Sequence, residues 1–131
     1  MKRALEFLQD CGTFYLATTE GDQPRVRPFG AIFEFEGKLY TATNNTKACF
    51  KQMMANPKVE ISGMNAKGEW IRIAGDIACD DRREAKAFAL EAVPVLKTMY
   101  QADDGIFTVM YFKEATATIA SFTGNPETFS F

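Results

Sequence analysis

Two short polar segments carry the side chains with the clearest chemistry in this chain. The first, Pro24-Arg25-Val26-Arg27-Pro28, alternates arginine with other residues. Residues i and i+2 of an extended strand point the same way, so both guanidinium groups are expected on one face. The second, Thr43-Asn44-Asn45-Thr46-Lys47, opens a helical pattern, and the free N–H groups at a helix N-terminus favour an anion. Together the two segments predict a phosphate-binding pocket.

Each of these side chains also has a less specific interpretation. Arginines at i and i+2 are most often part of a solvated sheet face, and Trp70 could equally be a core or interface aromatic. Lys47 favours the pocket, because a cation in the first turn of a helix opposes the helix dipole. An anion bound nearby would explain its position.

The chain contains no histidine. This removes the Ser-His-Asp triad, Cys-His pairs and imidazole metal sites at once. Cys11, Cys49 and Cys79 are far apart without C-x-x-C spacing, so we interpret them as small core residues, not as a disulfide or zinc framework. No side chain is a candidate catalytic residue and no metal site is predicted. The chemistry is therefore expected to come from a bound cofactor.

Composition limits the partners that this pocket could serve. The chain has 131 residues, which fits one domain spanning 1–131, and its 47% hydrophobic content supports a real core. Twelve phenylalanines exceed what one small core needs, so a subunit interface is expected. The net charge is −2 and the charges are dispersed, which argues against nucleic-acid binding. No apolar segment approaches the roughly 20 residues of a membrane span, and no signal peptide is apparent, so we expect a cytoplasmic protein.

Hydrophobic periodicity predicts three helices. The first covers Lys2 to Asp10 and stops at Gly12, and the second runs from Thr46 to Ala55 before Asn56-Pro57. The third follows an apparent capping box, Asp81-Arg82-Arg83-Glu84, and continues to Ala92, where Pro94 breaks or restarts it.

Six strands are predicted between and after these helices. Turn signals at Glu20-Gly21-Asp22, Glu36-Gly37 and Asn65-Ala66-Lys67-Gly68 indicate antiparallel hairpins. A polar tail, 121–131, follows the last strand. The pattern predicts an α+β protein with a small closed six-stranded barrel and short flanking helices. The predicted strands are Thr13–Thr19, Pro24–Glu36, Lys38–Thr43, Lys58–Met64, Glu69–Cys79 and Ile106–Ala120.

The order of these motifs resembles a known family. FYLATTEGDQPRVRPFG, KLYTATNNTKACFKQMMANPKVEIS and GEWIRIAGDIACDDRREAKAF follow the first helix in the order of the FMN-binding split-barrel proteins related to pyridoxamine 5'-phosphate oxidase, in their short single-domain branch. The similarity extends from about Leu5 to Phe112. It implies a six-stranded antiparallel split β-barrel and a homodimer with FMN in two shared clefts.

The resemblance also implies roles for individual residues. The strand Arg25, Val26, Arg27 and Pro28 would lie along the flavin and reach its phosphate. Tyr40, Thr41, Thr43 and Asn44 would line the ring and ribityl chain, and Thr46 and Lys47 would close on the phosphate. Trp70 and Arg72, on a strand used for dimer packing, would touch the far side of the ring. Because no basic residue follows Lys113, a second phosphate site for a vitamin B6 substrate is not expected.

The function implied is that of an FMN-dependent oxidoreductase. It would transfer hydride or electrons from NAD(P)H or a partner reductase to a small planar or nitroaromatic molecule. The same dimer cleft could alternatively serve a non-catalytic flavin or haem carrier, or a deazaflavin-dependent reductase. The absence of histidine argues against haem ligation.

Overall fold

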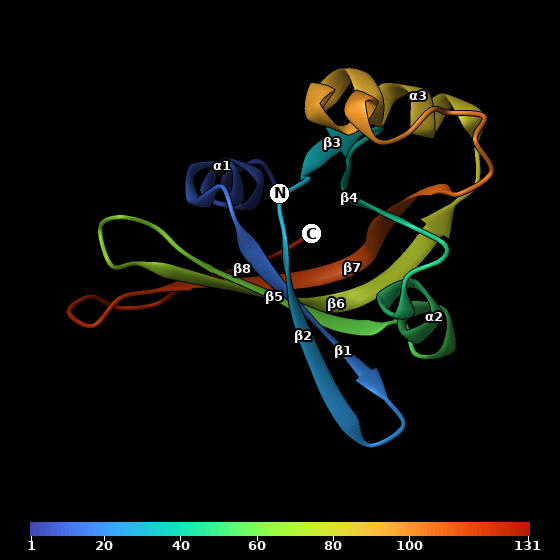
Figure 1. The fold of residues 1–131 in the computed structure, drawn as a ribbon. Coiled ribbons are helices and arrows are strands. Elements are labelled where there is room, and N and C mark those ends of the chain that lie inside the picture. The colour runs from blue at the N-terminus through green and yellow to red at the C-terminus, as the bar shows by residue number, and fades with distance from the viewer.

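The fold is a strongly curved antiparallel sheet with helices at its ends and on one side (Figure 1). A computed structural model describes residues 1–131. The strands follow the order β2-β1-β5-β6-β7-β4-β3, and β8 pairs with β7. The strands are β1 Phe14–Glu20, β2 Gln23–Phe29, β3 Phe33–Phe35, β4 Lys38–Asn44, β5 Lys58–Met64, β6 Trp70–Asp80, β7 Phe107–Ala120 and β8 Glu127–Ser130.

The α+β class and the antiparallel hairpins are confirmed, but the strand count and the closure are wrong. The sheet has eight strands, and no pairing joins β2 to β3 to close it. The predicted strand Pro24–Glu36 is two strands, because β2 pairs with β1 whereas β3 pairs with β4. The chain changes partner at 30–32, which interrupts the strand. The eighth strand comes from the polar tail, where Ser130 pairs with Thr116.

β7 organises the sheet. It pairs with β6 from Val109 to Ala120, its first part pairs with β4, and part of its second half pairs with β8. A register shift at Asp76 and Ile77 bends the β6–β7 pair. Next to this bulge the two backbones approach so closely that a methyl group at Gly75 would overlap the Glu114 carbonyl oxygen. The bend carries β6 and β7 up towards β4 (Figure 1).

Three α-helices and one 3₁₀ helix complete the chain: α1 Lys2–Cys11, α2 Ala48–Ala55, α3 Arg83–Ala92 and η1 Pro94–Thr98. α2 starts two residues later than predicted, at Ala48, because Asn45 and Thr46 form a turn. The predicted capping box is wrong: Arg82 is the N-cap of α3 and makes no side-chain cap. At Pro94, where a break or a new start was predicted, the 3₁₀ helix η1 begins. None of these helices has the length and apolar character needed to cross a lipid bilayer.

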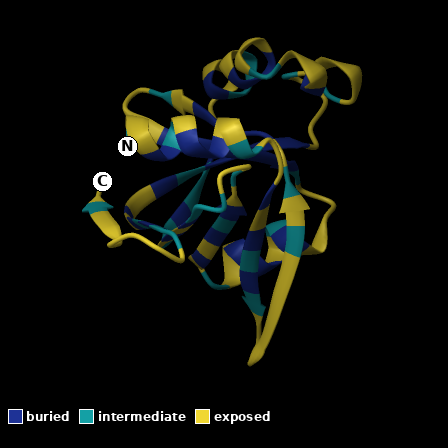
Figure 2. Cartoon of the chain, turned by 90° about the vertical axis from the view of Figure 1, so that its left-hand side faces the viewer, coloured by how far each residue is buried: buried dark blue, intermediate teal, exposed yellow.

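Two hydrophobic clusters form the core. The larger has 19 buried residues and joins α1 and α2 to the inner face of the sheet. The smaller has 10 and lies between the β3–β4 hairpin and α3 with η1. In Figure 2 buried positions alternate with exposed ones along the strands, and the outer sides of the helices are exposed. The outer face of the β1–β2–β5–β6 part of the sheet has no helix over it (Figure 1).

Candidate functional site

A groove of about 300 Å³ opens between four elements of the fold. The end of β2 and the chain after it form one wall, β4 and the start of α2 form the floor, and η1 with its flanking residues forms the opposite wall. Lys47 is the only charged side chain among its lining residues, and most of the others are hydrophobic. The lining residues are Pro28, Phe29, Gly30, Ala31, Ala42, Thr43, Lys47, Val93, Val95, Leu96, Met99 and Tyr100.

Lys47 is the N-cap residue of α2. No side chain caps this helix end, and its first turn holds no acidic residue. Lys47 makes no ion pair within the chain. The helix therefore presents an unpaired ammonium and uncapped backbone N–H groups together, and both favour an anion.

Asn44 and Thr46 shape the turn that places Lys47. The Asn44 Oδ1 atom accepts hydrogen bonds from the Thr46 backbone N–H at 3.0 Å and from its hydroxyl at 2.5 Å. Asn44 Nδ2 donates to the Tyr100 hydroxyl at 2.7 Å, and the Tyr100 ring stacks on Phe107 at 5.0 Å between centroids. Asn44 thus joins the helix start to the groove wall after η1.

The threonines of β4 are buried and use their hydroxyls within the chain. Thr41 donates to the Ala31 carbonyl oxygen at 2.7 Å, which fixes the chain where it crosses from β2 to β3. The Thr43 hydroxyl lies 3.6 Å from the Cys49 sulfur. Of the two, only Thr43 lines the groove.

The two arginines of β2 share a face, as the spacing predicts, but they have different partners. Arg25 forms an exposed ion pair with Glu20 at 2.9 Å. Arg27 donates to the Leu16 carbonyl oxygen, to the Thr18 hydroxyl at 2.7 Å and to Gln52 Oε1 at 2.6 Å. Arg27 therefore lies between β1 and α2.

Val26 and Pro28 alternate with these arginines and point to the other face of β2. Pro28 lines the groove, whereas Val26 is 69% exposed on the outer face of the sheet. The Arg-x-Arg-Pro segment thus divides its side chains between the sheet interior, the groove and the outer face.

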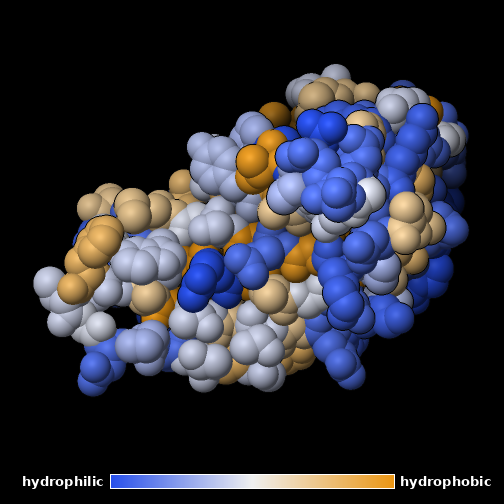
Figure 3. All heavy atoms as spheres, turned by 90° about the horizontal axis from the view of Figure 1, so that it is seen from below, coloured by the Kyte–Doolittle hydropathy of each residue, from blue (hydrophilic) through white to orange (hydrophobic).

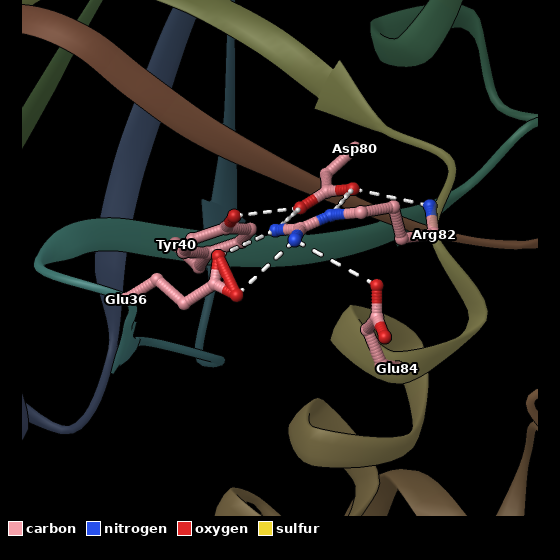
Figure 4. Close-up of polar contacts among 5 residues, drawn as sticks. All are labelled: Glu36, Tyr40, Asp80, Arg82 and Glu84. Carbon is pink, nitrogen blue, oxygen red and sulfur yellow. Dashed lines mark hydrogen bonds and ion pairs between the residues drawn. The ribbon is translucent and has the colours of Figure 1, made fainter.

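Tyr40 belongs to a separate polar cluster on the same strand. Its hydroxyl donates to Asp80 Oδ2 at 2.7 Å, and its ring packs against Phe33 and Tyr111, each with 5.3 Å between centroids (Figure 4). Burial, followed by the Asp80 carboxylate, raises the pKa of Tyr40 well above its usual range. Tyr40 does not line the groove.

Trp70 and Arg72 lie on the outer face of β6. Trp70 pairs with Met64 and Ala120 at the start of the strand and packs against Phe122 at 5.0 Å. Neither residue lines the groove of its own chain. Of the predicted ligand residues, the structure gathers Pro28, Thr43 and Lys47 in one groove, with Asn44 and Thr46 directly behind it.

The groove offers binding groups but no acid–base pair. No cluster of three or more metal-ligating side chains occurs in the chain. Burial, reinforced by Asp81, raises the pKa of the Cys79 thiol to about 12, and burial also raises the pKa of Cys11. Both thiols are therefore protonated at neutral pH and are poor nucleophiles. The arrangement can hold an anion beside an apolar surface.

Sequence reasoning missed the wall opposite β2 and the partners of Arg27. Val95, Met99 and Tyr100 line the groove, and the Pro94 restart was the available signal for a structured segment there. The sequence did not indicate that Gln52 is a partner of Arg27, because a glutamine within a short helix is expected on the surface.

Comparisons with known proteins agree with this architecture. A family model described as Pyridoxamine 5'-phosphate oxidase matches residues 1–104. A crystal structure of a NimC/NimA family protein from Clostridium acetobutylicum is 71% identical, with a TM-score of 0.99 over 100% of this chain and 92% of that one. Among curated proteins, no sequence matches the chain.

More distant structures share the fold. A pyridoxamine 5'-phosphate oxidase-related, FMN binding protein from Nostoc punctiforme is 15% identical, with a TM-score of 0.59 over 98% of this chain and 90% of that one. A heme binding protein from Mycobacterium smegmatis is 16% identical, with a TM-score of 0.76 over 97% of this chain and 57% of that one. The family model covers most of the chain, and the 71% identical relative has the same fold throughout. This chain therefore belongs to the pyridoxamine 5'-phosphate oxidase family.

Proposed function

We propose that the protein binds FMN and acts as a flavin-dependent oxidoreductase. The observation that carries the proposal is the position of Lys47, an unpaired cation at the uncapped start of α2 on the edge of an apolar groove. FMN combines a phosphate with a large flat ring system. A site for it therefore needs a cationic end and an apolar remainder, and this groove has both.

The residues around Lys47 fit a phosphate. Backbone N–H groups of the first turn of α2 have no side-chain cap, so they remain available as donors. Arg27 contacts α2 at Gln52, one turn after the start of the helix, and its Nε–H and one of its Nη2–H groups make no hydrogen bond within the chain. Arg25 would have to leave Glu20 before it could contribute.

The apolar wall of the groove fits the ring system. Val95 and Met99 are 63% and 60% exposed and lie on the same wall of the groove, so a bound ring system would cover apolar surface there. Bound FMN would supply hydride or electron transfer, and the chain would orient the cofactor and exclude water from one side. The reductant would be NAD(P)H or a partner reductase, and the acceptor a small planar or nitroaromatic molecule.

A non-catalytic flavin carrier is the second candidate. It is favoured by one observation, namely that the groove holds no acid–base group and no reactive thiol. Hydride transfer at a flavin does not require such a group, so turnover must be measured to separate the two functions.

The outer sheet face supports the proposed homodimer. Tyr15, Val26 and Met64 are each at least half exposed there, and Phe122 is 85% exposed beside Trp70. Seen from below, pale and hydrophobic side chains spread over the side where the two sheet hairpins end, and hydrophilic side chains gather on the other side (Figure 3). A second copy packed on this face would cover the aromatic excess and would bring its own Trp70 and Arg72 to a shared cleft.

The visible spectrum of the purified protein tests the proposal. Flavin absorption bands, or their appearance after addition of FMN and removal of the excess, would support it. Titration by flavin fluorescence should show weaker binding of riboflavin, because riboflavin lacks the phosphate. A Soret band without flavin would favour a haem carrier, and equal affinity for FMN and riboflavin would contradict the assignment of Lys47.

A further inference from the structure

A polar cluster surrounds Arg82 near the start of β4 (Figure 4). Arg82 donates from Nε to Asp80 Oδ1 at 3.1 Å and from Nη2 to Asp80 Oδ2 at 2.9 Å. It also donates to both carboxylate oxygens of Glu36, at 3.1 and 2.9 Å, and approaches Glu84 at 3.7 Å. Tyr40 donates to the same Asp80 carboxylate. These five residues form what we call the Arg82 cluster.

Arg82 uses most of its donors within the chain. Four of the five guanidinium N–H groups donate to the carboxylates of Asp80 and Glu36, and Nη1 also lies 3.7 Å from Glu84. The guanidinium also lies over the Phe35 ring, 5.6 Å from its centroid. The hydrogen bonds of Arg82 therefore join parts of the protein to one another.

The residues of this cluster come from separate segments of the fold. Glu36 lies in the β3–β4 turn, Tyr40 in β4 and Asp80 at the end of β6, whereas Arg82 and Glu84 begin α3. Glu36 and Gly37 have φ values of +50° and +76°, as a two-residue hairpin turn requires, and the Glu36 carboxylate makes a bidentate contact with Arg82. Arg82 thus fastens the start of α3 to the β3–β4 hairpin.

That hairpin and α3 also determine the shape of the groove. β4 continues from Tyr40 to Thr43 and Asn44 beside Lys47, and α3 leads into η1, which forms the apolar wall. Between them lies the smaller hydrophobic cluster, in which Tyr40, Leu90 and Leu96 are all buried. Phe88 of α3 packs on Phe35 of β3 with 4.8 Å between centroids. A change at the start of α3 would therefore be transmitted to η1 through packed side chains.

We infer that Arg82 is a positioning residue for the flavin groove, which it serves by holding α3, and with it the η1 wall, against β4. This inference rests on the proposed flavin site. Loss of Arg82 would let η1 move away from β4. The affinity for the flavin ring system would fall, while Lys47 would stay in place. The effect would then be equal for ligands with and without a phosphate.

The chain offers a matched control in Arg3. Arg3 also pairs with a carboxylate, Glu127 at 3.5 Å, and also lies over a phenylalanine ring, Phe7 at 5.9 Å. It belongs to α1, which contributes nothing to the groove. Arg3→Ala therefore removes an ion pair and a cation–π contact, though no hydrogen bond, without touching α3.

The experiment compares the unmodified protein with Arg82→Ala, Arg82→Lys and Arg3→Ala. The affinities for FMN and for riboflavin are measured in each protein. The rates of hydrogen exchange are measured at the backbone amides of Leu96, Met99 and Tyr100. These amides donate to carbonyl groups within and next to η1, so they report its order. In Arg82→Ala we expect both affinities to fall by the same factor, about tenfold, and all three amides to exchange faster. Arg82→Lys, which keeps the charge but not the planar fork, should lie between Arg82→Ala and the unmodified protein. Arg3→Ala should change neither property.

Unchanged affinities together with unchanged exchange in Arg82→Ala would overturn the inference, as would an equal effect of Arg3→Ala. A loss of FMN binding that spares riboflavin would also overturn it, because this pattern belongs to the phosphate site. If the unmodified protein binds neither flavin, the proposed function fails, and the exchange rates at η1 still decide whether Arg82 positions this wall. Arg82→Lys keeps the test valid if Arg82→Ala does not fold.

Discussion

Arg27 donates a hydrogen bond of 2.6 Å from Nη2 to Gln52 Oε1, and this bond ties β2 to the buried face of α2. Thr18 closes the arrangement, because its hydroxyl accepts from Arg27 at 2.7 Å and donates to Gln52 at 2.5 Å. The helix that presents Lys47 is thus held in place by the arginine that the sequence assigns to the phosphate. Arg27 therefore combines an observed structural role with the binding role that we propose for it.

The two arginines of β2 should differ in their effect on stability. Arg27→Ala removes hydrogen bonds from a charged donor and leaves Thr18 and Gln52 short of a partner, so we expect the free energy of unfolding to fall by about 1.5–3 kcal/mol. Arg25→Ala removes only an exposed ion pair with Glu20, which contributes about 0–1 kcal/mol. Urea unfolding of both variants measures the difference. Equal losses would contradict the structural role of Arg27.

Lys47 should act on the phosphate of FMN and not on the ring. Lys47→Ala is expected to weaken FMN binding about ten- to a hundredfold, the value of a charge-assisted hydrogen bond, and to leave riboflavin binding unchanged. Lys51→Ala is the matched control, because Lys51 lies on the same helix, outside the groove. Fluorescence titration provides both affinities. An equal loss in the Lys51 variant would show that only the net charge matters.

Local signals in the sequence predicted most elements of the fold. The turn at Asn65 to Gly68 is one example: Asn65 Oδ1 accepts from the backbone N–H groups of Lys67 and Glu69, and Gly68 has a φ of +79°. Closure of the barrel and the number of strands depend on which strands pair, and this is a long-range property. Nothing near Gly30 indicates that the chain changes partner there.

Part of the candidate site was predictable for a similar reason. The position of Lys47 follows from a local helix start, and the common face of Arg25 and Arg27 follows from strand alternation. The partners of those side chains were not predictable, because Gln52 and Glu20 reach them only through the folded arrangement. Tyr40 was assigned to the cofactor by resemblance, and the sequence did not indicate that its hydroxyl donates to Asp80.

Asp80 should make stability depend on pH in the acid range. Hydrogen bonds from Arg82, and a further one from Tyr40, lower the pKa of Asp80 from 3.8 to about 2 against the effect of burial. A depressed pKa in the folded state stabilises the protein above pH 4, and this contribution, about 2 kcal/mol, is lost as the pH falls from about 4 through 2. Asp80→Asn should therefore show a shallower loss of stability over that range. Thermal unfolding between pH 2 and 5 measures it, and identical slopes for both proteins would contradict the assignment.

The outer sheet face should determine the oligomeric state. Arg72 and Glu60 lie on this face of β6 and β5 and form no ion pair within the chain. In a twofold dimer each could meet the opposite charge of the partner, so Arg72→Glu should weaken the dimer about tenfold or more through like-charge contact. The double variant Arg72→Glu with Glu60→Arg should restore it. Trp70→Ala should weaken both the dimer and flavin binding.

Light scattering coupled to size exclusion, over a range of protein concentrations, measures this equilibrium. A monomeric mass for the unmodified protein with FMN fully bound would contradict the shared cleft. Failure of the double variant to recover the dimer, with its fold intact by circular dichroism, would show that Arg72 and Glu60 do not pair across the interface.

The chemistry should depend on cofactor occupancy more than on any single side chain. The chain has no histidine, and the groove has no acid–base group, so its residues contribute orientation and electrostatics. FMN-saturated protein is therefore expected to be reduced by NAD(P)H or dithionite and to be reoxidised by an added acceptor.

Saturating FMN should restore the reduction rate of Lys47→Ala, because losing one contact to the phosphate lowers occupancy before it lowers the rate of the loaded protein. Stopped-flow absorbance with each pyridine nucleotide measures both rates. If neither nucleotide nor a partner reductase reduces the unmodified protein, the carrier function replaces the enzymatic one.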